Sequence, residues 1–139
     1  MIVLDTNVVS ELFRSHPDAS VVEWLTSLPG EVAVTAVTVA ELLAGVRQMP
    51  DGRRKMALAE GIDAVLQPYR DDGLVLAFDD AAARQYATVL AERALLGLPI
   101  STAVAQIAAT CRSHAATLDT RNQKDFRHTG IDLVNPWLG

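Results

Sequence analysis

The first side chains that could do chemistry are Asp5, Thr6 and Asn7, which follow the short apolar run Ile2–Leu4. An apolar run of this length is typical of a buried strand, so the polar residues would stand at the end of that strand. A carboxylate, a hydroxyl and an amide together offer the oxygen ligands that Mg²⁺ and Mn²⁺ prefer. Asp5 could instead cap a helix that begins near Val8. The residue types alone leave both roles open.

Glu41 is the second candidate carboxylate, and it lies among apolar residues in the segment Thr38-Val-Ala-Glu41. Thr-x-x-Glu is the capping-box pattern, in which the Glu side chain reaches back to the start of its own helix. The pattern favours that structural role, and a role as a metal ligand is compatible with it. In both cases Glu41 would lie in the first turn of a helix that follows a second strand.

A third polar group follows the fourth expected strand and contains Asp119, Thr120, Asn122 and Asp125. A polar loop of this kind is commonly a solvated turn. In open parallel sheets, however, ligands bind beyond the carboxyl ends of the strands. This loop would leave the same edge of the sheet as Asp5, so it could complete a site there.

The sequence lacks the motifs of several other chemistries. It contains no Gly-x-Ser-x-Gly nucleophile elbow, no Gly-x-Gly-x-x-Gly fingerprint and no Gly-x-x-x-x-Gly-Lys-Ser/Thr phosphate loop. The three histidines are scattered, and none is paired with Cys111 at the spacing of a zinc site. A phosphatase of the haloacid-dehalogenase type would need a second Asp where this chain has Asn7. A metal ion held by carboxylates is the chemistry that remains.

Strand-like and helical segments alternate along the whole chain and would position these polar groups. The alternation predicts an α/β fold with a mostly parallel sheet of four to five strands, covered by helices on both faces. No repeat, low-complexity tract or linker interrupts the sequence, so we expect a single domain over residues 1–139. Strands are expected at 2–4, 32–35, 74–78, 117–118 and 131–134, with helices between them that begin near 8, 19, 38, 53, 80 and 102.

Composition and charge limit the function classes. Half of the 139 residues are hydrophobic, which suits one domain with one core, and the net charge is −5. A nucleic-acid binder that relies on neutralising phosphates would carry the opposite sign, unless bound cations or a local basic patch supply the attraction. We find no signal peptide and no apolar run long enough to span a membrane, and therefore expect a cytoplasmic protein.

Six segments, taken in their order along the chain, resemble one known family. They are Ile-Val-Leu-Asp5-Thr-Asn7, Thr38-Val-Ala-Glu41-Leu, Gly97-Leu-Pro-Ile-Ser101, Ala105-Gln-Ile-Ala108, Thr117-Leu-Asp-Thr-Arg-Asn122-Gln-Lys-Asp125-Phe126 and Asn135-Pro136-Trp137. Each is unspecific by itself, whereas the ordered set is highly specific. Together they resemble PIN-domain ribonucleases of the VapC toxin type, in the branch that contains FitB-like proteins. The resemblance extends over essentially the whole chain and implies a PIN-like three-layer α/β/α domain.

The resemblance also implies a function and a set of site residues. It implies a metal-dependent endoribonuclease toxin of a toxin–antitoxin system, with Mg²⁺ or Mn²⁺ as cofactor, RNA as substrate and a VapB-like antitoxin as inhibitor. Asp5 and Glu41 match the first two acidic metal ligands of the family. Thr6 and Thr120 match small polar residues of the site, and Asn122 falls where the family has Asp or Asn.

Position 104 departs from the family pattern. Relatives have a metal-binding Asp where this chain has Val104, in the segment Ile100-Ser-Thr-Ala-Val104. Helical periodicity would make Val104 a core residue, on one stripe with Ile107 and Cys111. Because metal-assisted cleavage needs enough negative charge to hold the cation, we expect a large loss of activity, which Asp119 could partly offset. Val104 would then mark either a degenerate toxin that keeps only antitoxin binding or an inactivating change.

Two further expectations concern partners. The alternative to a nuclease is a non-catalytic toxin-like module that binds an antitoxin and takes part in a DNA-bound regulatory complex. The helices also carry more apolar residues than five strands require, notably Trp24 and the stretch Leu90–Leu98, which favours a homodimer.

Overall fold

The sheet is the centre of the molecule in the computed structural model, which describes residues 1–138. Within that part of the chain five strands form one sheet in the order β3-β2-β1-β4-β5, and every neighbouring pair is parallel. The prediction of an α/β fold with a parallel sheet is confirmed. The strands are β1 (Ile2–Leu4), β2 (Val32–Thr35), β3 (Val75–Leu76), β4 (Thr117–Asp119) and β5 (Leu133–Val134).

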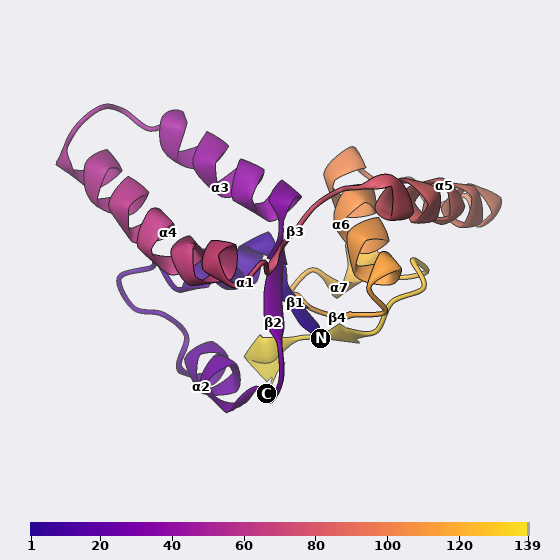
Figure 1. The fold of residues 1–139 in the computed structure, drawn as a ribbon, viewed down its shortest axis with the longest axis horizontal. Coiled ribbons are helices and arrows are strands. Elements are labelled where there is room, and N and C mark those ends of the chain that lie inside the picture. The colour runs from indigo at the N-terminus through magenta and orange to yellow at the C-terminus, as the bar shows by residue number, and fades with distance from the viewer. Residues whose placement is uncertain (139) are drawn as a thin grey trace.

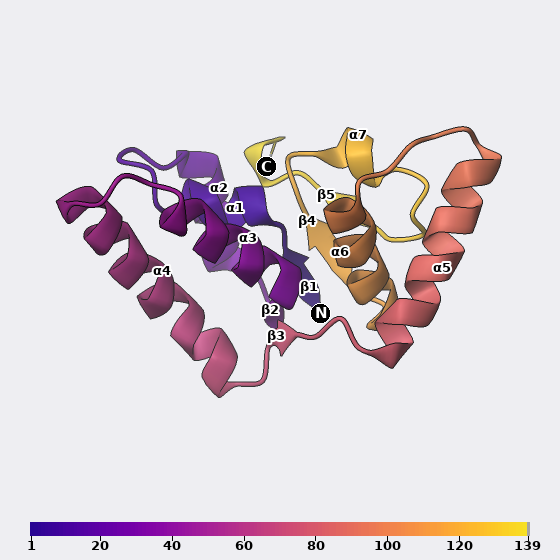
Figure 2. The ribbon, with the colours of Figure 1, turned by 90° about the horizontal axis from the view of Figure 1, so that it is seen from above.

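Helices connect the strands and cover both faces of the sheet, as Figures 1 and 2 show. On one face lie α1 to α4, and on the other α6 packs against the sheet with α5 outside it. This is the three-layer α/β/α arrangement that the sequence predicts. The helices are α1 (Thr6–Glu11), α2 (Ala19–Ser27), α3 (Ala36–Arg47), α4 (Arg53–Asp71), α5 (Asp80–Leu95), α6 (Thr102–Ser113) and the short α7 (Gln123–Phe126), followed by the 3₁₀ turn η1 (Pro136–Leu138).

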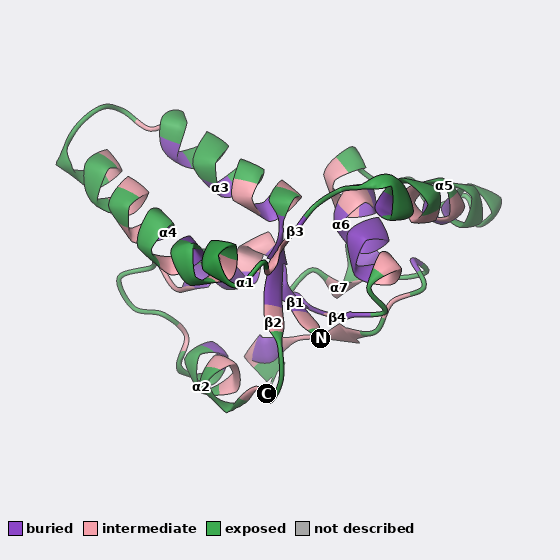
Figure 3. Ribbon diagram, in the orientation of Figure 1, coloured by how far each residue is buried: buried purple, intermediate pink, exposed green. Residues whose placement is uncertain are grey.

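Side-chain alternation along the strands divides the core into two clusters. In β1, Val3 packs toward α6 with Ile107 and Cys111, whereas Leu4 packs toward α1 and α3 with Val8. Successive side chains of a strand point to opposite faces, so neighbouring residues must enter different clusters. Figure 3 shows the buried residues concentrated on the strands and on the inner faces of the helices.

Helix starts follow the cap residues that the sequence offers. The side chains of Asp18, Asp79 and Ser101 accept hydrogen bonds from the first backbone N–H groups of α2, α5 and α6. Helix α4 extends to Asp71 although it contains Pro68. The helix continues past the proline because Leu66 and Tyr69 pack on the core, which offsets the loss of one backbone donor.

The topology places the carboxyl ends of β1, β2 and β4 side by side. The backbone N–H of Asp5 donates to the carbonyl of Asp119 at 2.9 Å, which ties the residues after β1 and at the end of β4 together. Among residues 1–138 no helix is both long enough and apolar enough to cross a membrane.

Candidate active site

Asp5 follows β1 directly, and the residue is only 5% exposed. Its Oδ1 accepts the backbone N–H of Thr6 at 2.8 Å, which makes it the N-cap of α1. Its Oδ2 accepts the Thr120 hydroxyl at 2.7 Å and the Asn7 amide at 3.3 Å. The two oxygens therefore serve different purposes, and the capping role and a role in a site coexist in one side chain.

Burial raises the pKa of the Asp5 carboxyl above its ordinary value. The hydrogen bonds from Thr120 and Thr6 oppose this shift because they stabilise the charged form, while the negative charge of Glu41 adds to it. The surroundings of Asp5 therefore disfavour its negative charge beside that of Glu41, unless a cation or a hydrogen-bond donor compensates it.

Glu41 lies close to Asp5 through Thr6. The Thr6 hydroxyl donates to Glu41 Oε1 at 2.8 Å and lies 3.0 Å from the Thr38 hydroxyl. The predicted capping box is wrong, because α3 begins directly after β2 and its N-cap is Thr35, whose hydroxyl accepts the Thr38 N–H at 3.1 Å. Glu41 thus lies in the second turn of α3 and points to Thr6 instead of to its own helix start.

The loop after β4 supplies Thr120 and Asn122. Thr120 is fully buried, and its hydroxyl donates to Asp5 while accepting the backbone N–H of Asn122 at 2.9 Å. The Asn122 side chain is exposed and donates to Asp125 Oδ2 at 2.8 Å. The structure therefore brings Asp5, Thr6, Glu41 and Thr120 into one network, with Asn122 joined to it through its backbone.

Asp119 points away from this network. It is the last residue of β4, one position before Thr120, so its side chain leaves the opposite face of the sheet. There its Oδ2 accepts the indole N–H of Trp24 at 2.7 Å, while its Oδ1 is buried without a hydrogen-bond partner. Burial raises the pKa of Asp119, and the Trp24 hydrogen bond opposes that shift. Asp119 does not line the cavity around Asp5.

A cavity of about 540 Å³ opens in front of Asp5 and Glu41, and Val104 and Asn122 lie on its walls. Val104 occupies the first turn of α6, where its N–H donates to the Ser101 hydroxyl at 3.2 Å. Its half-buried side chain also packs against the core cluster that contains Ile107. Val104 therefore presents a methyl-bearing surface to the cavity that holds the two carboxylates.

The residues present do not fit a protein-held divalent cation. The cavity brings together the carboxylates of Asp5 and Glu41, and in the part of the chain that the structure describes no group of three His, Cys, Asp or Glu residues is placed to hold a metal. Both oxygens of Asp5 and one of Glu41 already accept hydrogen bonds. Cys111 supplies no thiolate, because burial, and secondarily the Asp5 charge, raise its pKa to about 12.

Four residues of the cavity wall were not predicted as site residues from the sequence: Glu11, Arg14, Arg121 and Trp137. Glu11 is buried on α1, accepts the Asp18 N–H at 2.8 Å and pairs with Arg14 at 3.2 Å. The Arg121 guanidinium lies over the Trp137 ring at 4.9 Å from its centre. Glu11 could have been found from its spacing, since it follows Asn7 by four residues and so shares its helix face. The stacking of Arg121 on Trp137 joins segments with no common periodicity.

Comparisons with known proteins agree with this geometry. The PIN domain family matches residues 2–131. The VapC ribonuclease Y4jK of Sinorhizobium fredii is 39% identical over 99% of this chain and 98% of its own. The crystal structure of FitAcB from Neisseria gonorrhoeae superposes with a TM-score of 0.91 and 38% identity over 99% of both chains. A structure of FitAB bound to an IR36 DNA fragment gives a TM-score of 0.90 at 37% identity, over 99% of this chain and 96% of that chain. The chain belongs to the PIN-domain family and is of the VapC and FitB toxin type.

Proposed function

We propose that this chain is a cytoplasmic endoribonuclease toxin whose cleavage of RNA phosphodiester bonds is impaired at one position, Val104. The observation that carries the proposal is the contrast inside a single cavity. On one side Asp5, Thr6, Glu41 and Thr120 form a complete hydrogen-bonded network. On the other side Val104 presents an apolar surface where the family pattern has a carboxylate.

The side chains of this network have defined tasks in the proposed reaction. Asp5 and Glu41 supply negative charge to the cavity, and Thr6 holds Glu41 in place through its hydroxyl. Thr120 holds Asp5 in the same way, and Asn122 lies on the wall where an RNA phosphate would enter. With an Asp at position 104, three carboxylates would face the cavity besides Glu11, which is paired with Arg14, and carboxylate oxygens are ligands that Mg²⁺ and Mn²⁺ prefer.

The Val104→Asp variant tests the proposal. Position 104 is in the first turn of α6, where a negative charge interacts favourably with the helix dipole, so the variant should fold. We expect it to bind Mn²⁺ in calorimetry and to cleave RNA, with Val104→Asn as the control of similar size and no charge. If Val104→Asp neither binds Mn²⁺ nor cleaves RNA while it remains folded, the nuclease proposal is wrong.

A second function is favoured by the same Val104. A chain that cannot hold a cation could act as a non-catalytic module that binds a VapB-like antitoxin in a DNA-bound complex. The relative solved as FitAB on a DNA fragment supports such an assembly. The acidic cavity also suits an Arg or Lys side chain of an antitoxin, since Asp5 and Glu41 would pair with it. Restored RNA cleavage in Val104→Asp argues for the nuclease, and antitoxin binding without restored cleavage argues for the module.

We also expect a homodimer. Exposed leucines gather at the end of α5 and in the turn after it, with Leu95 88% and Leu96 55% exposed. Exposed apolar groups of this kind are typical of partner surfaces. Gel filtration should give the mass of a dimer at micromolar concentration, and a monomer mass would remove this expectation.

A further inference from the structure

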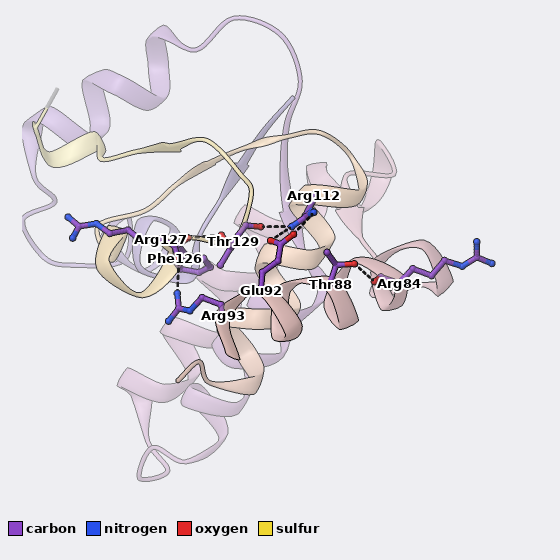
Figure 4. A network of polar contacts seen from close by, with 8 residues as sticks. All are labelled: Arg84, Thr88, Glu92, Arg93, Arg112, Phe126, Arg127 and Thr129. Atoms are coloured by element: carbon purple, nitrogen blue, oxygen red, sulfur yellow. Dashed lines mark hydrogen bonds and ion pairs between the residues drawn. The ribbon is translucent and has the colours of Figure 1, made fainter. Parts of the chain in front are cut away.

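Arg93 is a buried cation that the site described so far does not use. It lies in the last turn of α5, and the residue is only 5% exposed. Its guanidinium donates four hydrogen bonds, all to backbone carbonyls: Nε to Leu98 at 3.4 Å, Nη2 to Pro99 at 2.8 Å, and Nη1 to Asp125 at 3.0 Å and Arg127 at 2.6 Å. Figure 4 shows the side chain reaching toward the backbone of Arg127.

No carboxylate pairs with Arg93 among the salt bridges of residues 1–138. The negative end of the α5 dipole and the four carbonyls compensate its charge instead. This arrangement requires an arginine, because its planar guanidinium carries five N–H donors in fixed directions, whereas lysine has three donors on one atom. The acceptor set is therefore specific for a guanidinium.

The four carbonyls belong to two separate segments that both border the cavity. Leu98 and Pro99 lead into Ser101 and the first turn of α6, which carries position 104. Asp125 and Arg127 belong to α7 and the residue after it. Between the two segments lies a small hollow of about 120 Å³, lined by Arg93, Pro99, Ile100, Ser101, Val104 and Asp125. Arg93 thus sets the separation of the α6 start from α7.

A chain of hydrogen bonds continues from α7 to Asp5. Arg93 holds the backbone of Asp125, whose carboxylate accepts the Asn122 side-chain amide at 2.8 Å. The Asn122 N–H donates to the Thr120 hydroxyl at 2.9 Å, and that hydroxyl donates to Asp5 Oδ2 at 2.7 Å. Each step fixes the direction of the next donor, so a displacement at Arg93 would propagate to the carboxylate.

A second arginine holds the end of the same segment. Arg112 of α6 donates to the Thr129 carbonyl at 3.3 Å and to Glu92 of α5 at 3.1 Å (Figure 4). These bonds lie beyond α7, and the Thr129 hydroxyl in turn donates to the Phe126 carbonyl at the end of α7. Arg112 therefore fixes where the segment ends, and Arg93 fixes where its site residues lie.

We propose that Arg93 is a positioning residue: by holding four carbonyls of the α6 start and of α7, it sets the distance between position 104 and Asn122, and it holds Asn122 so that its backbone N–H fixes the Thr120 hydroxyl that donates to Asp5. Its importance for RNA cleavage rests on the proposed function. Its effect on the geometry of Asn122 and Thr120 does not, and this separates the two proposals experimentally.

The direct test is ¹⁵N NMR of the 14.9 kDa chain with Arg93→Lys and Arg93→Met. We expect both variants to shift or broaden the Asn122 side-chain amide and the Thr120 backbone amide. Val89→Ala is the matched control, because Val89 is fully buried on the same helix and makes none of these hydrogen bonds. It should lower the melting temperature but leave both signals in place.

A kinetic test uses the Val104→Asp background, in which the proposed function predicts measurable cleavage. There Arg93→Lys should lower kcat by roughly tenfold to a hundredfold and leave KM little changed, because small misplacements at a site cost rate more than binding. The Val89→Ala control should alter neither parameter.

Two results would overturn the proposal. One is unchanged Asn122 and Thr120 signals in a folded Arg93→Lys or Arg93→Met chain, and the other is an equal change in Val89→Ala. If both Arg93 variants fail to fold, Asp125→Ala replaces them, because it cuts the chain between Arg93 and Asn122. Unchanged Thr120 and Asn122 signals in that variant would also contradict the proposal. If Val104→Asp never cleaves RNA, the proposed function fails while the NMR result for Arg93 still stands.

Discussion

The two flanks of the cavity differ in how they are made. The first flank, at the ends of β1 and β2, consists of Asp5, Thr6, Thr38 and Glu41, which hydrogen-bond to one another directly. The second flank, at the start of α6 and on α7, consists of Val104 and Asn122, which are held by packing and by Arg93. The first flank is polar and complete, whereas the second presents an apolar side chain to the carboxylates.

The difference teaches that the fold and the site depend on position 104 in different ways. Val104 lies half-buried in the first turn of α6, where we expect an Asp to face the cavity without changing the helix. We expect the chemistry to change, because the resemblance to the family implies an Asp at this position. Loss of one flank therefore leaves the fold and the first flank intact.

The largest expected effect is on RNA cleavage in a chain whose second flank has been restored by Val104→Asp. In the Val104→Asp background, Asp5→Asn should lower RNA cleavage roughly a thousandfold, since charge stabilisation by a bound cation supplies several kcal/mol and each 1.36 kcal/mol is tenfold. In the unaltered chain the same change should have little effect, because the second flank is already incomplete. Single-turnover rates of the four chains measure this coupling. An equal loss in both backgrounds would show that the flanks act independently.

The second prediction concerns the packing that holds α7. Phe126 is 1% exposed and lies in the cluster under α6, so Phe126→Ala should lower the free energy of unfolding by about 3–5 kcal/mol. Phe78→Ala is the control, because Phe78 is 36% exposed and its ring lies edge-on to Tyr86. Urea unfolding of both variants gives the comparison. A similar loss in the two would mean that the second flank does not depend on this core contact.

The third prediction tests whether the segment after α7 requires a glycine at position 130. Gly130 has φ of +79°, and a Cβ there would lie 2.7 Å from Arg112 Nη1. Gly130→Ala should cost about 1–2 kcal/mol for the left-handed backbone and displace the Arg112 side chain in addition. Gly97→Ala should lose only the stability that the left-handed backbone costs, because Gly97 has φ of +66° and no atom within 4 Å of its Cβ position. Equal losses of stability in urea unfolding would show that Arg112 moves freely.

The smallest expected effect concerns Asp119, which belongs to neither flank. Burial raises its pKa above the ordinary 3.8 in the folded state. Between the two pKa values the folded chain therefore keeps a proton that the unfolded chain has lost. The favourable contribution of Asp119 to the free energy of unfolding is complete below pH 3.8, and it is lost as the pH rises through the raised pKa. Asp119→Asn keeps an oxygen for Trp24 and removes the titration. The unaltered chain should become less stable relative to this variant as the pH rises toward neutral.

Urea unfolding at several pH values, followed by tryptophan fluorescence, measures that difference. A constant difference between the two chains across the pH range would contradict the expectation. A difference that grows with falling pH would mean that the ionised Asp119 stabilises the fold.

Much of the fold follows from local pattern. Short apolar runs correctly predict where β1, β2 and β4 begin, and α5 and α6 begin where expected, directly after the cap residues Asp79 and Ser101, because burial of a strand and capping of a helix are decided by neighbouring residues. Strand β5 begins at Leu133, two residues later than expected, and α1 begins at Thr6, two residues earlier. The capping box at Thr38 fails for a related reason. Thr35 at the end of β2 has an extended backbone and caps α3 first, so Thr38 is already helical.

The direction of side chains is only partly predictable. Because side chains alternate along a strand, Asp119 and Thr120 are expected to point to opposite faces of the sheet once the end of β4 is known. Only Thr120 reaches Asp5. That Trp24 would meet Asp119 depends on where α2 packs. The four carbonyls around Arg93 come from segments 5 to 34 residues away, and no periodicity relates them.

The sequence by itself determined the parallel α/β fold and the family, and it predicted Asp5, Thr6 and Glu41 as site residues. Strand ends in a parallel sheet gather polar side chains at one edge, so Asp5 and Glu41 were identifiable from their places after β1 and β2. Only the tertiary structure decided that Asp5 caps a helix and joins the site at once, that Asp119 faces Trp24, and that Arg93 joins α6 to α7. These contacts depend on the relative placement of whole elements, which long-range packing fixes and local residue patterns do not.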